Sequence, residues 1–293
     1  MGSRIKAGCL GSALVLVTLV VVAIALAVFQ GKRTPAGPAD YVALGSSYAA
    51  GAGLGPLQKN SPLLCARSVN GYPQQLARLR HLRIADMSCG GAVTTHVLNG
   101  GQAFQGPQIR VIDARTRLVT LTVGGNDIGY VSDLSLLAAR KADTPFGWLV
   151  RSLWKGPKPL GTRDYAKLRR ELVATLRAIH DRAPEATVVV ATYPKILPPG
   201  GTCPALGLTG AEVEQMRQVG DRLAAVTRSA ARQAGAIVFD MNAQADGHHV
   251  CSDEPSTSGW PAANGAPFHP TLPGAKATAQ AISQALETER ARP

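Results

Sequence analysis

Four short polar segments, widely spaced along the chain, carry side chains with chemical reactivity. Two adjacent hydroxyls, Ser46 and Ser47, follow the apolar run YVALG, and His269 lies near the C-terminus in FHPTLPG. Glycine-rich segments occupy residues 88–92 (SCGGA) and 124–127 (GGND). A serine can attack an acyl carbon when a base removes its proton, and N–H groups can stabilise the resulting oxyanion. Each segment alone is typical of a turn, but together they supply every group that acyl transfer needs.

Five apolar runs predict β-strands, with helical patterns between them. The strands are expected at Tyr41–Leu44, Arg83–Met87, Leu118–Val123, Thr187–Thr192 and Ala236–Asp240. This alternation indicates a three-layer α/β/α fold around a parallel sheet of about five strands, with ligands binding beyond the carboxyl ends of the strands. Three reactive segments directly follow a strand, and His269 precedes the last predicted helix. All four are therefore expected at one edge of the sheet.

Three helices are predicted from residue patterns. Apolar side chains recur at three- and four-residue steps over 165–179 and form one stripe that would face a core. Thr209 and Glu212 have the spacing of a capping box at the start of the next helix, and Gly235 is expected to end it. The last helix is expected after Pro273.

The segment from Gly129 to Gly161 is an insert with an apolar character. Trp148 and Trp154 lie within its sequence PFGWLVRSLWKGPKPL. We interpret the insert either as a surface loop whose aromatic side chains cover the sheet, or as a segment that lines an acyl pocket or contacts a membrane.

Two other motif interpretations are weaker. The sequence GAGLG at residues 51–55 lacks the G-x-G-x-x-G spacing of a dinucleotide site, and no Walker-type lysine follows a glycine run. The G-x-S-x-G elbow of the α/β-hydrolases is absent from the sequence. A hydrolase built from these residues must therefore have another architecture.

The N-terminus predicts a membrane-targeting segment. Arg4 and Lys6 precede an uncharged stretch, Leu10–Phe29, of roughly twenty residues, which is the length that can cross a bilayer as a helix. Residues 25–27 (ALA) also form a small-x-small site where a signal peptidase could cut. Basic residues flank both ends, so the charge rule does not decide orientation. The segment is either a retained anchor or a cleaved signal peptide, and the rest of the chain is expected to be exported.

Composition agrees with this organisation. We expect a signal peptide or anchor at 1–30, a Pro/Gly-rich linker at 31–39 and one catalytic domain at 40–290. Apolar residues make up 45% of the chain, enough for a large core. The net charge is +12, but no basic run interleaves with aromatic residues, so nucleic acid is not expected as a partner. A basic exported protein would favour an anionic membrane or cell-envelope surface.

Four cysteines, Cys65, Cys89, Cys203 and Cys251, follow the apolar segment, and an even number in an exported chain suggests two disulfides. The pairing Cys65–Cys89 with Cys203–Cys251 closes the shortest of the possible loops, worth roughly 3–4 kcal/mol each. The competing interpretation is a zinc site in HHVC, where two histidines precede Cys251. No Cys-x-x-Cys pair supports it, and we expect no metal.

In order and spacing, the four reactive segments resemble the sequence blocks of SGNH hydrolases of the GDSL esterase/lipase family, over residues 40–290. The resemblance implies that Ser47 is the nucleophile and His269 the base. It also implies an oxyanion hole made by the backbone amides of Ser47 and Gly91 and the side chain of Asn126. A flavodoxin-like fold, ester cleavage through a serine acyl-enzyme and no cofactor are further implications. The cysteines resemble those of a secreted bacterial branch whose loops are stapled by disulfides.

Two positions depart from the family pattern. Ser46 stands where the family has Asp, and Ala266 stands three residues before His269, where an Asp would complete a triad. The resemblance implies that some secreted members orient the histidine through a backbone carbonyl. We therefore expect the carbonyl of Ala266 to accept the Nδ1 hydrogen bond of His269.

Alternatives to this arrangement remain at the sequence level. Asp253 or Glu254, on the loop that leads to the histidine, could orient the ring instead. Asp246 and His249 reproduce the D-x-x-H spacing and could replace the base. The principal hypothesis is an exported monomeric esterase or lipase that acts on an acyl ester. The alternative is a catalytically inactive cell-envelope binding protein on the same fold.

Overall fold

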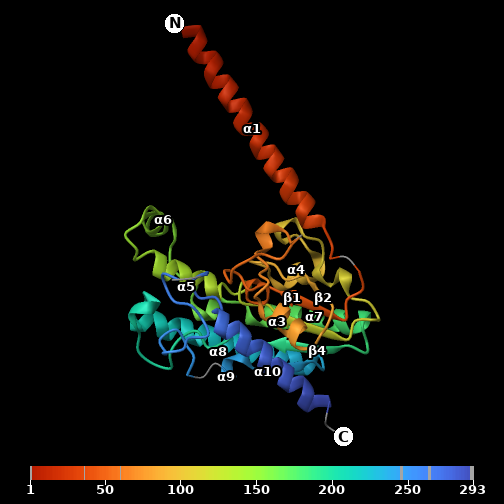
Figure 1. The fold of residues 1–293 in the computed structure, drawn as a ribbon. Coiled ribbons are helices and arrows are strands. Elements are labelled where there is room, and N and C mark those ends of the chain that lie inside the picture. Colours follow the sequence, from red (N-terminus) through yellow and green to blue (C-terminus); the bar gives the residue numbers. More distant parts are fainter. Residues whose placement is uncertain (1, 36, 60, 245–246, 263–264, 291–293) are drawn as a thin grey trace.

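The computed structural model describes residues 2–35, 37–59, 61–244, 247–262 and 265–290. A parallel sheet lies at its centre (Figure 1). The sheet has five strands in the order β2-β1-β3-β4-β5. The strands are β1 (Tyr41–Gly45), β2 (Ile84–Asp86), β3 (Leu118–Thr122), β4 (Thr187–Ala191) and β5 (Ile237–Phe239). The predicted α/β/α fold and all five predicted strands are confirmed, with each strand end within one residue of its predicted position.

Helices occupy the connections between the strands. The α-helices are α1 (Gly2–Lys32), α2 (Ser47–Ala50), α3 (Tyr72–Leu79), α4 (Thr94–Asn99), α5 (Tyr130–Ala139), α6 (Pro145–Leu153), α7 (Tyr165–Arg182), α8 (Gly210–Gln233), α9 (Met241–Gln244) and α10 (Leu272–Arg290). Short 3₁₀-helices are η1 (Leu63–Cys65), η2 (Gln102–Phe104), η3 (Gln108–Val111), η4 (Leu160–Thr162) and η5 (Pro204–Leu206).

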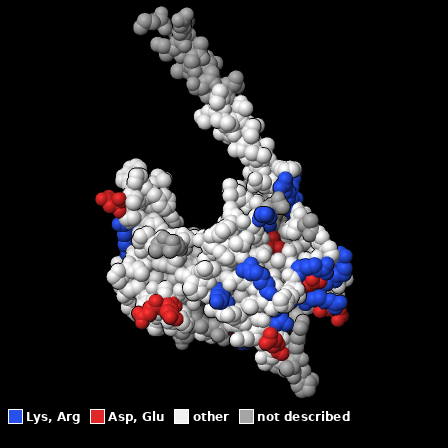
Figure 2. Space-filling model, viewed as in Figure 1, with Lys and Arg blue, Asp and Glu red and all other residues white. Residues whose placement is uncertain are grey.

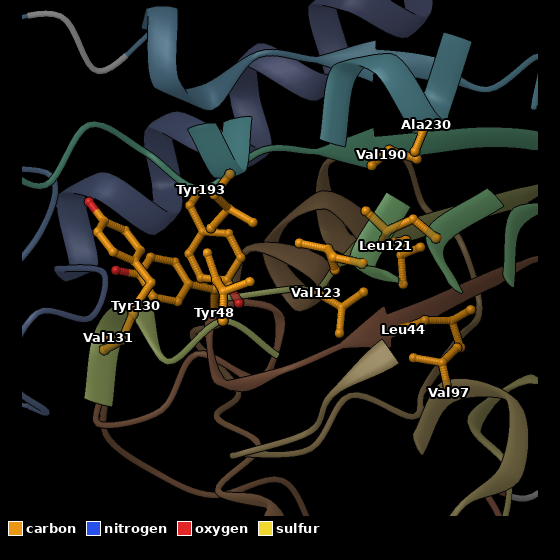
Figure 3. Packing of buried hydrophobic residues seen from close by; sticks show 14 of the residues in the cluster. Leu44, Tyr48, Val97, Leu121, Val123, Tyr130, Val131, Val190, Tyr193 and Ala230 are labelled. Atoms are coloured by element: carbon orange, nitrogen blue, oxygen red, sulfur yellow. The ribbon is translucent and has the colours of Figure 1, made fainter. Parts of the chain in front are cut away.

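Two apolar clusters cover the two faces of the sheet, because alternate residues of a strand point to opposite faces. Val42 and Leu44 of β1 belong to the cluster that includes α4, α7 and α8. Tyr41 and Ala43 belong to the other cluster, with α3 and α10. Figure 3 shows part of the first cluster, with Leu44 and Leu121 packed between the sheet and the helices.

The predicted helix signals appear in the structure. Thr209 caps α8 by accepting a hydrogen bond from Glu212 N (3.3 Å), and the Glu212 carboxylate accepts one from Thr209 N (2.7 Å). Gly235, with φ 71°, follows the end of this helix. The insert is not simply a surface loop, since it forms α5 and α6. Trp154 packs against the core and Trp148 is exposed.

Helix α1 projects away from the α/β/α domain (Figure 1). Its described apolar stretch, Val15–Lys32, is long and apolar enough to cross a membrane. Its last turn meets the domain, where Gln30 Oε1 accepts a hydrogen bond from Leu63 N (3.2 Å). Gly31 lies so close to η2 that a Cβ at this position would be 2.4 Å from the Ala103 carbonyl oxygen. The helix therefore ends docked on η1 and η2.

The four cysteines of the domain form two disulfides in the structure, Cys65–Cys89 and Cys203–Cys251. The first joins η1 to the segment that follows β2. The second joins the loop before α8 to the loop that leads to His269. The sulfur of Cys251 is thereby bonded to the sulfur of Cys203 and is not a free thiolate, which the competing zinc interpretation requires.

Candidate active site

The turn after β1 presents Ser47 at the carboxyl edge of the sheet, as the first residue of α2. Gly45, with φ 132°, makes this turn, and a Cβ at Gly45 would lie 2.2 Å from the Thr122 carbonyl oxygen. The Gln108 side chain holds the turn from the other side, accepting from Gly45 N (2.8 Å) and donating to Gly45 O (3.0 Å). The position of the serine is therefore set by backbone contacts on both sides.

Of the two adjacent hydroxyls, only Ser47 faces a base. Its Oγ lies 2.8 Å from Nε2 of His269, and its side chain is partly exposed. Ser46 is fully buried, and its Oγ lies 2.8 Å from the hydroxyl of Tyr193. The residue that departs from the family pattern at this position thus makes a structural hydrogen bond beneath the site.

His269 is oriented by the carbonyl of Pro267, which lies 2.8 Å from Nδ1. This corrects the expectation that Ala266 would supply the carbonyl. The Ala266 oxygen instead accepts from His269 N (3.2 Å) and from Ser258 Oγ (2.6 Å). Phe268, between the carbonyl and the ring, has a left-handed conformation (φ 56°), and this turn brings the Pro267 oxygen in front of the imidazole.

The alternative groups lie elsewhere. Asp253 is exposed, and the Nδ1 position that it would have to reach is occupied by the Pro267 carbonyl. His249 accepts a hydrogen bond from Cys251 N (3.2 Å) through its own Nδ1, within a loop turn. Asp246, its proposed partner, lies outside the described residues. The structure thus brings Ser47 together with His269.

Tyr48, next to the nucleophile, holds the loop that carries the base. Its buried hydroxyl donates to the Phe268 carbonyl, and its ring centroid lies 5.3 Å from that of His269. Figure 3 shows Tyr48 beside Tyr193 and Tyr130 in one aromatic group. Sequence reasoning missed this role, although a tyrosine directly after the serine was the available signal.

The two candidate oxyanion donors outside α2 come from the turns after β2 and β3. Asn126 Nδ2 donates to the Ala92 carbonyl (2.9 Å), which fixes the side-chain amide beside the segment that contains Gly91. An amide NH₂ has two hydrogens, so one remains available for a ligand. Gly91 has φ 74°, which a glycine adopts at low cost.

A second polar network supports this edge of the site. Thr94 Oγ1 lies 2.5 Å from Asp127 Oδ1 and 2.6 Å from Glu171 Oε2. A hydroxyl has one hydrogen, so it can donate to only one of the two carboxyls at a time. Asp127 also accepts a hydrogen bond from Thr94 N (3.0 Å), and burial raises the pKa of Asp127. The network ties the Asn126 turn to α4 and α7, and no sequence pattern pointed to it.

The histidine is suited to act as a base at neutral pH. Burial lowers the pKa of His269 from 6.5, and the hydrogen bond to Pro267 only partly opposes this. The ring is therefore neutral near pH 7, with Nε2 able to accept a proton from the adjacent serine.

Residues 43–277 match the GDSL-like lipase/acylhydrolase family. The chain therefore belongs to this family, and it is a carboxylic ester hydrolase. It is 33% identical to Lipase 2 of Streptomyces coelicolor over 72% of each chain. A Streptomyces rimosus lipase is 31% identical over 85% of this chain and 89% of its own.

Two solved structures share the fold over nearly their whole length. The extracellular lipase of Streptomyces rimosus has a TM-score of 0.66 and 30% identity, covering 84% of this chain and 99% of its own. Phospholipase A1 of Streptomyces albidoflavus has a TM-score of 0.67 and 28% identity, covering 85% and 99%. The three-layer architecture around the site is thus that of known ester hydrolases.

Proposed function

We propose that this chain is an exported serine esterase or lipase that cleaves carboxylic esters through an acyl-enzyme on Ser47. The observation that carries the proposal is the 2.8 Å contact between Ser47 Oγ and His269 Nε2, with Nδ1 of the ring held by the Pro267 carbonyl. A neutral carbonyl can fix the tautomer and orientation of the ring, as a carboxylate does in a triad, but it stabilises the imidazolium less.

In the proposed reaction, His269 Nε2 takes the proton of Ser47 as Oγ attacks the acyl carbon. The oxyanion accepts hydrogen bonds from the backbone amides of Ser47 and Gly91 and from Asn126 Nδ2. The tetrahedral intermediate collapses, the C–O bond to the alcohol breaks, and the imidazolium returns its proton to the leaving alkoxide. Water then repeats these steps on the acyl-enzyme, releasing the acid and restoring the serine. No metal or organic cofactor takes part in this proposal.

Labelling with a fluorophosphonate tests the mechanism directly. Peptide mapping is expected to place the adduct on Ser47, and Ser47→Ala is expected to remove both the adduct and the esterase activity. Ser46→Ala serves as the matched control, since the neighbouring hydroxyl is buried against Tyr193. An adduct on Ser46, or active protein without an adduct, would contradict the proposal. The alternative, a catalytically inactive binding protein, predicts no adduct and no hydrolysis.

We further propose that α1 is retained as a membrane anchor and that the domain expected at 40–290 lies on the exported side. Two disulfides fit an oxidising compartment. The helix continues past the small-x-small site at 25–27 to Lys32, two residues beyond the expected boundary at 30, and its last turn is bonded to the domain through Gln30. Peptide mapping of the membrane fraction tests this. Residues 10–24 should be present on the mature protein, whereas a chain that begins near residue 28 would show cleavage.

A further inference from the structure

Helix α6 exposes an apolar face without a partner in the described part of the chain. Its four large apolar side chains are between 43% and 72% exposed: Phe146, Trp148, Leu149 and Leu153. The side that packs on the domain is formed by Gly147 and Val150, which are buried. The charge within the helix, Arg151, is turned back onto the preceding loop, where its guanidinium donates to the carbonyl of Arg140 (2.7 Å). The outward face of α6 is thus mostly apolar, and its exposed hydroxyl, Ser152, bonds to the Trp148 carbonyl of the same helix.

A second apolar region surrounds the base of α1. Leu63 and Leu64 of η1 and Phe104 of η2 are about half exposed or more, at the place where the last turn of α1 rests on the domain. The described part of α1 is apolar, and 6% of its stretch Val15–Lys32 is buried. Apolar side chains therefore continue from α1 onto the surface of the domain.

The candidate active site lies between these two regions. On one side, Gln102 of η2 donates to the Gly90 carbonyl (2.5 Å), next to the candidate oxyanion donor Gly91. On the other side, Asn126 leads within four residues into α5, against which α6 packs. The two turns that carry the proposed oxyanion donors are thus directly connected to η2 and to the α5–α6 insert.

Both regions also point the same way. α1 and α6 project from the same side of the molecule (Figure 1), and Figure 2 shows the outline hollowed between them. In this view, the side of α6 that faces α1 and the described length of α1 above its base are free of charged patches. Lys and Arg lie at the base of α1 and, together with Asp and Glu, on the rest of the domain. Such a charge-free side bounded by charged surface is typical of a surface that meets a membrane.

We propose that the exposed face of α6 is a membrane-docking surface, which enters the same bilayer leaflet that α1 crosses. A lipid bilayer is the one occupant that explains both features, because α1 has the length and composition of a membrane span and projects from the same side of the domain as α6, across the hollow. The exposed side chains Trp148, Leu149 and Leu153 would then insert into the lipid, and the hollow would face the bilayer surface. Ester substrates would reach Ser47 from the bilayer, which makes membrane acyl lipids the substrate class. That last step rests on the proposed esterase function, whereas the docking does not.

Fluorescence quenching tests the docking without using activity. The full chain carrying Ser47→Ala is reconstituted in vesicles of phosphatidylcholine and phosphatidylglycerol whose acyl chains bear bromine, a quencher of tryptophan. We expect bromine to quench part of the tryptophan fluorescence. This quenched part should be absent from the chain that carries Trp148→Phe in addition to Ser47→Ala. Trp260→Phe, a partly buried tryptophan that contacts the Gly207 loop, is the control and should leave the quenched part in place. Equal quenching with and without Trp148 would overturn the proposal.

Activity on two substrates tests the consequence for catalysis. The double variant Trp148→Ser/Leu153→Ser is assayed on an ester lipid in vesicles and on a short-chain ester dissolved in water. Loss of two interfacial anchors should lower the vesicle activity at least about tenfold and change the activity on the dissolved ester by less than about twofold. Leu79→Ser is the matched control, because Leu79 is 49% exposed on α3 at the opposite, amino-terminal edge of the sheet.

The outcomes separate the two proposals. Wild-type protein that hydrolyses neither ester would overturn the esterase mechanism, and the quenching result would still decide the docking. An equal loss on both esters, or none on vesicles, would overturn the role of α6 at the membrane. A smaller particle mass of the double variant in detergent solution would instead identify α6 as a contact between copies of the chain, and would also overturn it.

Discussion

Nε2 of His269 lies 2.8 Å from Oγ of Ser47, although the two residues are 222 positions apart in the chain. The serine is placed by the turn after β1, and the histidine by the loop before α10. These elements meet because β1 lies inside the sheet, between β2 and β3, and α10 packs beside α3 on one face of the sheet. Folding therefore assembles the pair before any substrate binds, and the predictions below concern the groups that keep it aligned.

Asn126→Ala is expected to lower kcat by roughly a hundred- to a thousandfold, the usual cost of losing one oxyanion donor. The side chain also donates to the Ala92 carbonyl (2.9 Å), so the thermal unfolding midpoint must be recorded with the kinetics. Folded protein that loses less than about threefold in kcat would argue against the oxyanion role.

His269→Ala is expected to abolish activity, whereas Asp253→Asn should leave it within about twofold, since the aspartate is exposed and the Pro267 carbonyl holds Nδ1. Steady-state kinetics on a dissolved ester measure both. If Asp253→Asn alone removed the activity of folded protein, a relocated triad would replace the carbonyl arrangement.

Tyr48→Phe is expected to lower kcat by about tenfold or more, because its hydroxyl holds the Phe268 carbonyl and small misplacements of a catalytic group cost rate. Unfolding free energy should fall by about 1–3 kcal/mol, since the removed donor leaves a buried carbonyl unsatisfied. Tyr41→Phe is the matched control: it is equally buried and loses a hydrogen bond to Thr120 (2.7 Å) away from the site. A similar stability loss with unchanged kcat is expected there, and equal kcat losses in both variants would contradict a positioning role for Tyr48.

The acid limb of the kcat/KM profile is expected to have its midpoint below pH 6.5. Burial lowers the pKa of His269 from that value, so the neutral ring persists as the pH falls toward 6.5 and is lost only at lower pH. The same shift makes stability rise with pH across this window, because the unfolded chain binds a proton there that the folded chain does not. A pH–rate series on a dissolved ester measures the midpoint, and a value above 6.5 would show that burial does not control the base.

Some features follow from local sequence, because short-range physics decides them. Strand positions followed from apolar runs bounded by turn residues, and the start of α8 from the Thr209–Glu212 spacing. The grouping of the four reactive segments followed from a general property of parallel sheets, whose strands all end at the same edge. Membership of the family followed from the order and spacing of those segments.

Other features were decided only by tertiary contacts. The carbonyl of Pro267 rather than that of Ala266 faces the imidazole because Phe268 has a left-handed conformation. The carbonyl of Phe268 is in turn held by the hydroxyl of Tyr48, a residue 220 positions earlier in the chain. The hydroxyl of Thr94 meets carboxyls from two distant elements, which no local pattern encodes. The apolar residues of α6 could equally have been core, since composition does not say what a helix face packs against. Their exposure on the same side of the domain as α1 depends on where the chain places the whole helix, and only the folded structure determines that.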